Sequence, residues 1–247
     1  MVDHAVLILG GTSLALELAK SVQGMAVRSI YSLAGRTTPK SLPDMEVRVG
    51  GFGGVDALSQ YLRAENITAV IDATHAYAAQ ISVNAQMACE NTSVPLLRLQ
   101  EAPWRQEDGD NWITVLDVAA ARDEAAKIAS RVFVSTGRQS VADFVSDPRC
   151  WWLLRVVPTD ETLPAFQNGE YVYERGPFDL TDELALMREH SIETIISKNA
   201  GSKATYAKII AARELSLPVI MINRPESGST LQVGTVPDAI GWLVSVT

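Results

Sequence analysis

The sequence predicts a doubly wound α/β fold with parallel sheets, arranged as two lobes. Short apolar runs alternate with helical patterns along the 247 residues, which is the sequence form of βαβ units. A strand, two glycines and a helical pattern follow one another near the start of the chain. A polar segment at 100–112, which contains proline and glycine, separates two such α/β patterns. We therefore expect a first domain over residues 1–99 and a second domain over residues 100–247.

The elements of the first domain follow from its apolar spacing. Strands are expected where apolar residues run together, at 4–10, 26–35, 67–73 and 94–99. Helices are expected where apolar residues recur every three or four positions, at 13–22, 55–66 and 78–91. The order of these elements is that of a nucleotide-binding unit.

The second domain repeats the alternation. Its strands are expected at 112–116, 131–137, 151–157, 192–199 and 217–223, with helices at 118–130, 181–190 and 205–216. A last helix is expected at 236–246, and its apolar face can pack on either domain. The domain boundary therefore stays open for this helix.

Composition and charge narrow the classes of partner. The net charge of −8 argues against a general nucleic-acid binder, which needs a basic surface to neutralise phosphates. It leaves room for an anionic small molecule, because a local field can oppose the net charge. Cys89 and Cys150 stand in apolar or helical settings and are expected to be reduced core thiols. No run approaches the length of a membrane span or a signal sequence, so we expect a cytoplasmic protein without a membrane partner.

The first candidate site is the turn in "LILGGTSLALELA" (7–19). Glycines allow a tight turn and a close backbone approach, and the free N–H groups at a helix start attract a pyrophosphate. Gly10, Gly11, Thr12 and Ser13 would line such a site. The spacing is not G-x-G-x-x-G, so the motif alone is weak. The alternative is a plain βα turn in which Thr12 or Ser13 caps the helix.

The segment after the second strand favours NADP(H) over NAD(H). In dinucleotide folds an acidic residue at this place binds the ribose of NAD, whereas an arginine accommodates the 2′-phosphate of NADP. The stretch "SLAGRTTPK" (32–40) supplies Ser32 and Arg36, with Thr37 and Lys40 nearby and no acid before Asp44. The alternative is that Arg36 is an ordinary surface arginine in a loop.

Several other chemistries find no support in the sequence. No tyrosine has a lysine four residues on, as a short-chain dehydrogenase would need. The three histidines are far apart and neither cysteine belongs to a metal-binding motif, so we expect no metal. The nucleophile-elbow and P-loop spacings are missing. Hydride chemistry carried mainly by a cofactor is what remains.

The chain resembles the precorrin-6A reductase family in a series of motifs that covers most of its length. The match runs through "LILGGTS", "SLAGR", "VIDATHAYAAQISVNAQMAC", "PLLRL", "PW", "VFVSTGR", "GPF" and "IISKNAGSKATYAKIIAARELSLPVIMINRP". Ala76 and Tyr77 stand where the family usually has proline and phenylalanine. Residues 200–202 are Ala-Gly-Ser where the family often has serine and two glycines.

The resemblance implies two Rossmann-like lobes with parallel sheets and a cleft between them. It also implies that NADPH binds the N-terminal lobe and that the macrocycle lies in the cleft. The implied reaction is reduction of a double bond of precorrin-6A to give precorrin-6B in cobalamin biosynthesis.

The "DATHAYA" stretch (72–78) supplies the candidate catalytic residues Asp72, His75 and Tyr77, with Thr74 beside the cofactor. It ends a strand, and ligands of such sheets lie outside the carboxyl ends of strands. With an unperturbed pKa of about 6.5, His75 can supply the proton that the reduced bond needs, as can Tyr77 or water. The alternative is turn chemistry, in which Asp72 caps the following helix and Thr74 bonds local backbone.

Two loops that follow strands of the second domain are candidates for the many carboxylates of the substrate. Cationic side chains and exposed amides can bind and orient such groups, although each charge alone can equally be a solvated surface charge. The residues are Thr136, Gly137 and Arg138 in "STGRQS", and Lys198, Asn199, Gly201 and Lys203 in "SKNAGSKAT".

Two other functions stay open from the sequence. One is an NADP-dependent reductase of a different anionic substrate, for which the cationic loops would hold smaller acids. The other is a dinucleotide-sensing module without turnover. The oligomeric state has no signal in the sequence.

Overall fold

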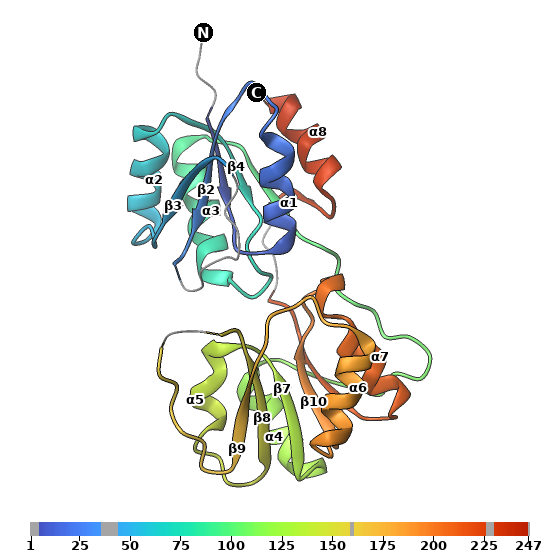
Figure 1. Ribbon diagram of the computed structural model, residues 1–247. Helices are drawn as coiled ribbons and strands as arrows, with labels where there is room; N and C mark the ends of the chain where they lie inside the picture. Colours follow the sequence, from blue (N-terminus) through green and yellow to red (C-terminus); the bar gives the residue numbers. More distant parts are fainter. Residues whose placement is uncertain (1–4, 36–43, 159–160, 226–229, 247) are drawn as a thin grey trace. The chain divides into compact units, whose positions relative to one another are not determined.

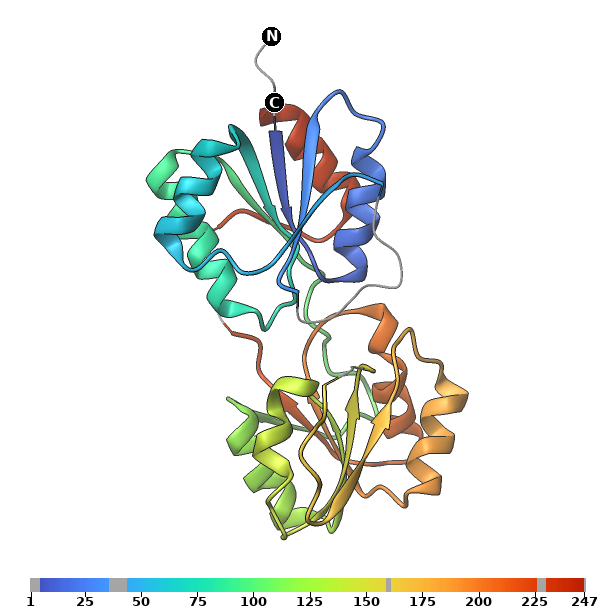
Figure 2. The same ribbon diagram turned by 60° about the vertical axis from the view of Figure 1, so that its left-hand side comes forward.

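The computed structural model describes residues 5–35, 44–158, 161–225 and 230–246 (Figure 1). The chain forms two compact units. Unit 1 comprises Met1–Ala102 and Pro225–Thr247, and unit 2 comprises Pro103–Arg224. Each unit is a parallel six-stranded sheet between layers of helices, which confirms the predicted α/β class (Figure 2). No helix in the described ranges is long and apolar enough to cross a membrane.

The sheet of unit 1 has the strand order β12-β5-β4-β1-β2-β3, and every neighbouring pair is parallel. This is the 3-2-1-4-5-6 order of dinucleotide-binding folds, with its reversal between β1 and β4. The strands are β1 (Ala5–Leu9), β2 (Arg28–Leu33), β3 (Glu46–Val49), β4 (Ile67–Asp72), β5 (Leu96–Leu99) and β12 (Gln232–Val233).

Alternating residues of the strands bury against helices on both faces of unit 1. Along β1, Val6 and Ile8 belong to one core cluster, and Leu7 and Leu9 belong to another. This follows from the alternation of side chains in a strand. Helices α1 (Ser13–Val22) and α8 (Val236–Val246) pack on the first cluster, and α2 (Val55–Ala64) and α3 (Ala79–Thr92) pack on the second (Figures 1 and 2).

Unit 2 has the strand order β6-β11-β10-β7-β8-β9, with its reversal between β7 and β10. Helices α6 and α7 cover one face over a core that includes Phe133, Ile195 and Ile209. The strands are β6 (Trp112–Val115), β7 (Arg131–Ser135), β8 (Trp151–Val156), β9 (Gly169–Tyr173), β10 (Thr194–Lys198) and β11 (Val219–Ile222). The helices are α4 (Val118–Ile128), α5 (Val141–Phe144), α6 (Leu180–Glu189) and α7 (Ala207–Glu214), with short 3-10 turns η1 (Arg138–Ser140) and η2 (Lys203–Thr205).

The boundaries of the two units differ from those expected from the sequence. The chain returns to unit 1 at Pro225, whereas residues up to 235 were expected in the second domain and the helix at 236–246 was left open between the two. The chain returns because β12 pairs with β5 in the sheet of unit 1, with Gln232 in register with Arg98. Helix α8 also belongs to unit 1, because its Ala239 and Leu243 are buried in the cluster that α1 covers.

Three strands lie outside the ranges expected from the sequence: β3, β9 and β12. Strand β3 (EVRV) lies at a sheet edge and has no buried residue. Its sequence has no run of apolar residues that would predict a strand. Strand β9 is also an edge strand with half-buried or exposed side chains, and β12 has two residues. Edge strands carry a weak hydrophobic signal because one side of their backbone has no neighbour.

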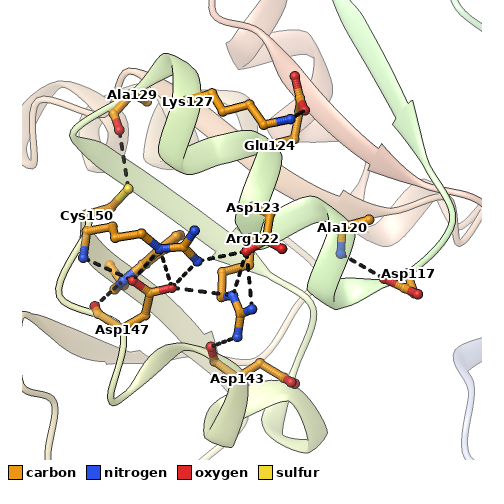
Figure 3. A network of polar contacts seen from close by, with 12 residues as sticks. Asp117, Ala120, Arg122, Asp123, Glu124, Lys127, Ala129, Asp143, Asp147 and Cys150 are labelled. Carbon is orange, nitrogen blue, oxygen red and sulfur yellow. Dashed lines mark hydrogen bonds and ion pairs between the residues drawn. The ribbon is translucent and has the colours of Figure 1, made fainter.

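An ion-pair network holds the connection that precedes β8 (Figure 3). The guanidinium of Arg149 pairs with Asp147 and, at 2.8 Å, with Asp123 of α4. Hydrogen bonds from Arg149 lower the pKa of Asp147. Cys150 is buried and its Sγ donates to the carbonyl of Ala129 at 3.3 Å. Both cysteines are free and buried, as expected from the sequence.

Replacing Leu243 by alanine tests how much α8 contributes to unit 1. Its side chain is fully buried in the core of that unit, so we expect Leu243→Ala to lower the free energy of unfolding by about 2–5 kcal/mol. Val244→Ala is the control, because that neighbour is 62% exposed and its loss should cost less than about 0.5 kcal/mol. Urea unfolding measures both, and equal effects would contradict the packing.

Candidate functional site

One register row crosses the sheet of unit 1 near its carboxyl edge. Parallel pairing places Leu9 beside Ser32 and beside Asp72. Ser32 in turn lies beside Arg48, and Asp72 lies beside Arg98. Residues in register across a parallel sheet point to the same face. Four polar side chains therefore share the face that α2 and α3 cover, at the edge where ligands of such sheets bind.

The turn between β1 and α1 requires both of its glycines. A Cβ on Gly10 would lie 2.3 Å from the ring of Tyr31, and Gly11 has a φ of +117°. The amide of Gly10 donates to the carbonyl of Ser32 at 2.9 Å. The amide of Gly11 donates to the hydroxyl of Tyr31 at 3.1 Å, and burial raises the pKa of that phenol. The turn is thus preformed against the end of β2.

Thr12 links this turn to the loop after β4. Its Oγ1 accepts from the amide of Ala15 at 3.0 Å and donates to the carbonyl of Ala73 at 2.9 Å. It is therefore the N-cap of α1, which was one of the two alternatives that the sequence left open. Ser13 is exposed in the first turn of the helix, where the free N–H groups of the helix start can face an anion.

Asp72 holds the turn that begins the "DATH" stretch. It is 3% exposed, and its Oδ1 accepts from both the amide and the hydroxyl of Thr74, at 3.1 and 2.6 Å. Its Oδ2 pairs with a guanidinium nitrogen of Arg98 at 3.5 Å. These contacts form a local turn that fixes the backbone leading to His75. They differ from the alternative considered from the sequence, because α3 has Ala78 as its N-cap without a side-chain cap bond, and the Thr74 hydroxyl bonds the Asp72 carboxylate instead of backbone.

His75 and Tyr77 lie at the surface side of the same turn. His75 is exposed, and its Nδ1 accepts from the amide of Tyr77 at 3.3 Å. The two ring centroids are 5.7 Å apart. This geometry leaves the imidazole in a defined position at the carboxyl edge of β4, with access to solvent.

Two hollows in the described part of unit 1 differ in size and position. One cavity of about 40 Å³ lies between α3 and the ends of β4 and β5, with Asp72, Ser82, Gln86 and Arg98 in its wall. That volume suits a water molecule or two. A shallow hollow of about 520 Å³ lies at the opposite edge of the sheet, around Ile67 at the amino end of β4.

In unit 2 the predicted substrate loops meet at the reversal of strand order. Lys198, at the end of β10, donates from its Nζ to the carbonyl of Thr136 at 2.9 Å, beyond the end of β7. Burial lowers the pKa of Lys198. The hydroxyl of Thr136 is buried in a hydrogen bond with Ser140, and Gly137 turns the chain with a φ of +82°. The lysine thus joins the two loops that were expected to act together.

The remaining cations of these loops differ in exposure. Arg138 begins the η1 turn and pairs with Glu161 at 3.1 Å, where Glu161 is 71% exposed. Lys203 is exposed at the start of η2, after Gly201, whose φ is +80°. Lys203 is therefore accessible to an anionic ligand, whereas Arg138 and Lys198 are half-buried.

Asn199 bonds the backbone of Trp104 near the start of unit 2. Its Oδ1 accepts from the amide of Trp104 at 2.7 Å, and its Nδ2 donates to the carbonyl of Trp104 at 3.0 Å. Its own carbonyl, together with that of Ala200, accepts from the guanidinium of Arg224. Trp104 and Arg224 stand next to the two points where the chain passes between the units. The loop after β10 therefore anchors both connecting segments.

Sequence reasoning missed a buried charged cluster below this loop. Lys208 is 3% exposed, and its Nζ donates to the carbonyl of Thr205 at 2.6 Å and lies 4.9 Å from the ring of Trp104. Burial lowers its pKa to about 7. Arg155 and Glu183 pair nearby at 2.6 Å, with Glu183 fully buried. The sequence did carry one sign of this burial, because Lys208 falls on the apolar stripe of the 205–216 helical pattern.

Arg36, with Thr37 and Lys40, lies outside the described residues. The other predicted cofactor residues, from Gly10 to Thr74, lie together at the reversal between β1 and β4.

Comparison with known proteins places the chain in a family. Residues 5–244 match the family described as precorrin-6x reductase CbiJ/CobK. The chain belongs to this family. A precorrin-6A reductase of Rhodobacter capsulatus is 40% identical over 238 residues, covering 96% of this chain and 95% of that protein. One of Mycobacterium tuberculosis is 42% identical over 220 residues, covering 89% and 88%.

A solved structure named CobK precorrin-6A reductase extends this result to the fold. It superposes with a TM-score of 0.90 at 40% identity, covering 98% of this chain and 96% of the other. Both units of the family fold are therefore present in this chain.

Thr12 can be tested with a matched pair of variants. Thr12→Val keeps the shape but removes the hydroxyl that caps α1 and bonds Ala73, so we expect a loss of about 1–2 kcal/mol in the free energy of unfolding. Thr12→Ser keeps both bonds and should stay close to the wild type. Urea unfolding compares them, and an equal loss in both variants would count against the capping role.

The buried Lys208 predicts a pH dependence of stability. Its folded pKa of about 7 lies below the unfolded value, so the unfolded chain binds an extra proton above pH 7 and stability rises with pH. Relative to Lys208→Met, the wild type should gain about 2 kcal/mol between pH 7 and pH 9. Lys127→Met is the control, because the side chain of Lys127 is 66% exposed. Parallel pH profiles for wild type and Lys208→Met would refute the shift.

Proposed function

We propose that this chain reduces a double bond of the precorrin-6A macrocycle with hydride from NADPH, giving precorrin-6B in cobalamin biosynthesis. The observation that carries the proposal is the full-length match to the precorrin-6x reductase family, over both units. Membership of this family makes the chain an oxidoreductase.

The residues of unit 1 fit a nicotinamide dinucleotide. The strand order, the glycine turn and the start of α1 at the β1/β4 reversal are the features that bind a pyrophosphate in such folds. Gly10, Gly11 and Ser13 would line the pyrophosphate, while Thr12 holds the turn. When bound, the dihydronicotinamide supplies the hydride. Preference for NADPH is supported by Arg36 and by the lack of an acidic residue between the end of β2 and Asp44.

His75 is proposed to hold the proton that the reduced bond takes up. It is exposed at the carboxyl edge of β4, and its ring is oriented by the amide of Tyr77. The Asp72 carboxylate is proposed to act through the backbone, because it holds Thr74 and so sets the position of His75. Tyr77 stands beside the imidazole as a second candidate for the same proton.

The loops of unit 2 are proposed to bind the carboxylates of the tetrapyrrole. Lys203 is an exposed side chain, and Arg138 is half-buried beside the exposed Glu161. The ammonium of Lys198 bonds the carbonyl of Thr136 between the two loops. Backbone amides near Gly137 and Gly201 add donors, since both glycines turn the chain at positive φ. Asn199 is proposed to support this loop through Trp104.

The activity can be tested anaerobically with purified protein, precorrin-6A and either NADPH or NADH. We expect the macrocycle spectrum to change in step with NADPH oxidation, and much more slowly with NADH. His75→Ala should lower kcat by about 100-fold without weakening NADPH binding, because the proton donor is lost while the cofactor site remains. His190→Gln is the control, since that histidine lies at the end of α6 in unit 2.

NADPH binding without turnover of precorrin-6A would reject the proposed substrate. Full activity of His75→Ala would move the proton step to Tyr77 or water. Turnover of other unsaturated acids at a higher rate would favour the broader reductase that the sequence also allowed.

A further inference from the structure

We propose that Arg48 on β3 binds the 2′-phosphate of NADPH and is a determinant of cofactor preference. The inference deepens the proposed function and rests on its preference for NADPH. Arg48 lies on the edge strand that sequence reasoning did not locate, so it was not among the predicted cofactor residues.

The position of Arg48 follows from the sheet register. Gly10 bonds the carbonyl of Ser32, and Ser32 lies in register with Arg48 on the next strand. The NH1 of Arg48 is 3.5 Å from the hydroxyl of Ser32. In dinucleotide folds the adenosine ribose lies at the end of the second strand, beyond the pyrophosphate turn. Adjacent strands are about 4.8 Å apart, so a long side chain on β3 reaches the end of β2.

The hydrogen-bond partners that the described residues offer Arg48 are neutral oxygens. No carboxylate in the described parts of the chain pairs with its guanidinium, which instead donates to the carbonyls of Gly50 and Gly51. By contrast, Arg28 on the neighbouring strand pairs with both Glu46 and Glu65. A half-buried cation whose partners are neutral oxygens keeps its full charge for a phosphate.

Two aromatic rings also hold the guanidinium in place. Its Cζ lies 3.7 Å from the ring centroid of Phe52 and 5.3 Å from that of Tyr61. Stacking fixes the plane of the group and leaves its N–H edge for hydrogen bonds. A Cβ on Gly50 or Gly51 would meet no described atom within 4 Å. The weak 3.5 Å contact with Ser32 can be exchanged for a phosphate oxygen at little cost.

The test uses 2′,5′-ADP and AMP as probes, which differ by the 2′-phosphate alone, and NADPH and NADH as cofactors. Arg48→Met keeps an unbranched apolar chain over Phe52 but removes the charge. We expect it to weaken binding of 2′,5′-ADP and NADPH by about 10- to 100-fold, with AMP and NADH changed less than about threefold. Arg48→Lys should restore part of the loss, and kcat with saturating NADPH should stay near the wild-type value.

Arg63→Met is the matched control, because Arg63 is an exposed arginine of α2 that bonds the carbonyl of Asn91 at the opposite edge of the sheet. Circular dichroism and thermal melting establish that each variant folds. A wild type that binds 2′,5′-ADP no more tightly than AMP would reject the NADPH preference itself. A wild type with that preference and an Arg48→Met variant that retains it would reject the role of Arg48 alone. Equal weakening of both probes in Arg48→Met would reassign Arg48 to holding the fold of β3.

Discussion

In each unit, parallel pairing of the strands places the candidate functional side chains at the carboxyl edge of the sheet. All six strands of a unit end at the same edge, and reversal of the strand order leaves two loops there that diverge from each other. In unit 1 these loops follow β1 and β4, and Thr12 bonds across them to Ala73. In unit 2 they follow β7 and β10, and Lys198 bonds across them to Thr136. The same constraint thus builds a candidate dinucleotide site and a candidate anion site.

A buried ion pair lies near the carboxyl edge of each sheet. Asp72 and Arg98 pair beneath the "DATH" turn, and Arg155 and Glu183 pair beneath the loop that contains Lys203. Buried ion pairs contribute little net stability compared with apolar packing, but removal of one partner is costly. Any backbone arrangement that separates such a pair leaves a buried charge without its partner, which disfavours that arrangement. Departures from an apolar core are expected where a site must hold its shape.

The sequence was sufficient for the parts that depend on local pattern. The apolar runs of β1, β4, β7 and β10 located the carboxyl edges, and the residues after them proved to lie together. The sequence was insufficient where the role of a residue depends on a contact with a residue far away in the chain. Asn199 was placed correctly after β10, but its contact with Trp104 spans 95 residues and has no local signal. Arg48 escaped notice because β3 is a polar edge strand.

The anchoring of both connecting segments on the loop after β10 bears on how the protein is made. Unit 2 is a continuous stretch, Pro103–Arg224, whereas unit 1 gains β12 and α8 after it. During synthesis from the amino end, unit 2 has all its strands before the sheet of unit 1 receives its last one. Asn199 and Arg224 then fix the exit and return of the chain on a finished unit. Both ends of the insert are bonded to one pair of residues, Asn199 and Ala200, so the two segments that continue into unit 1 leave unit 2 from neighbouring points.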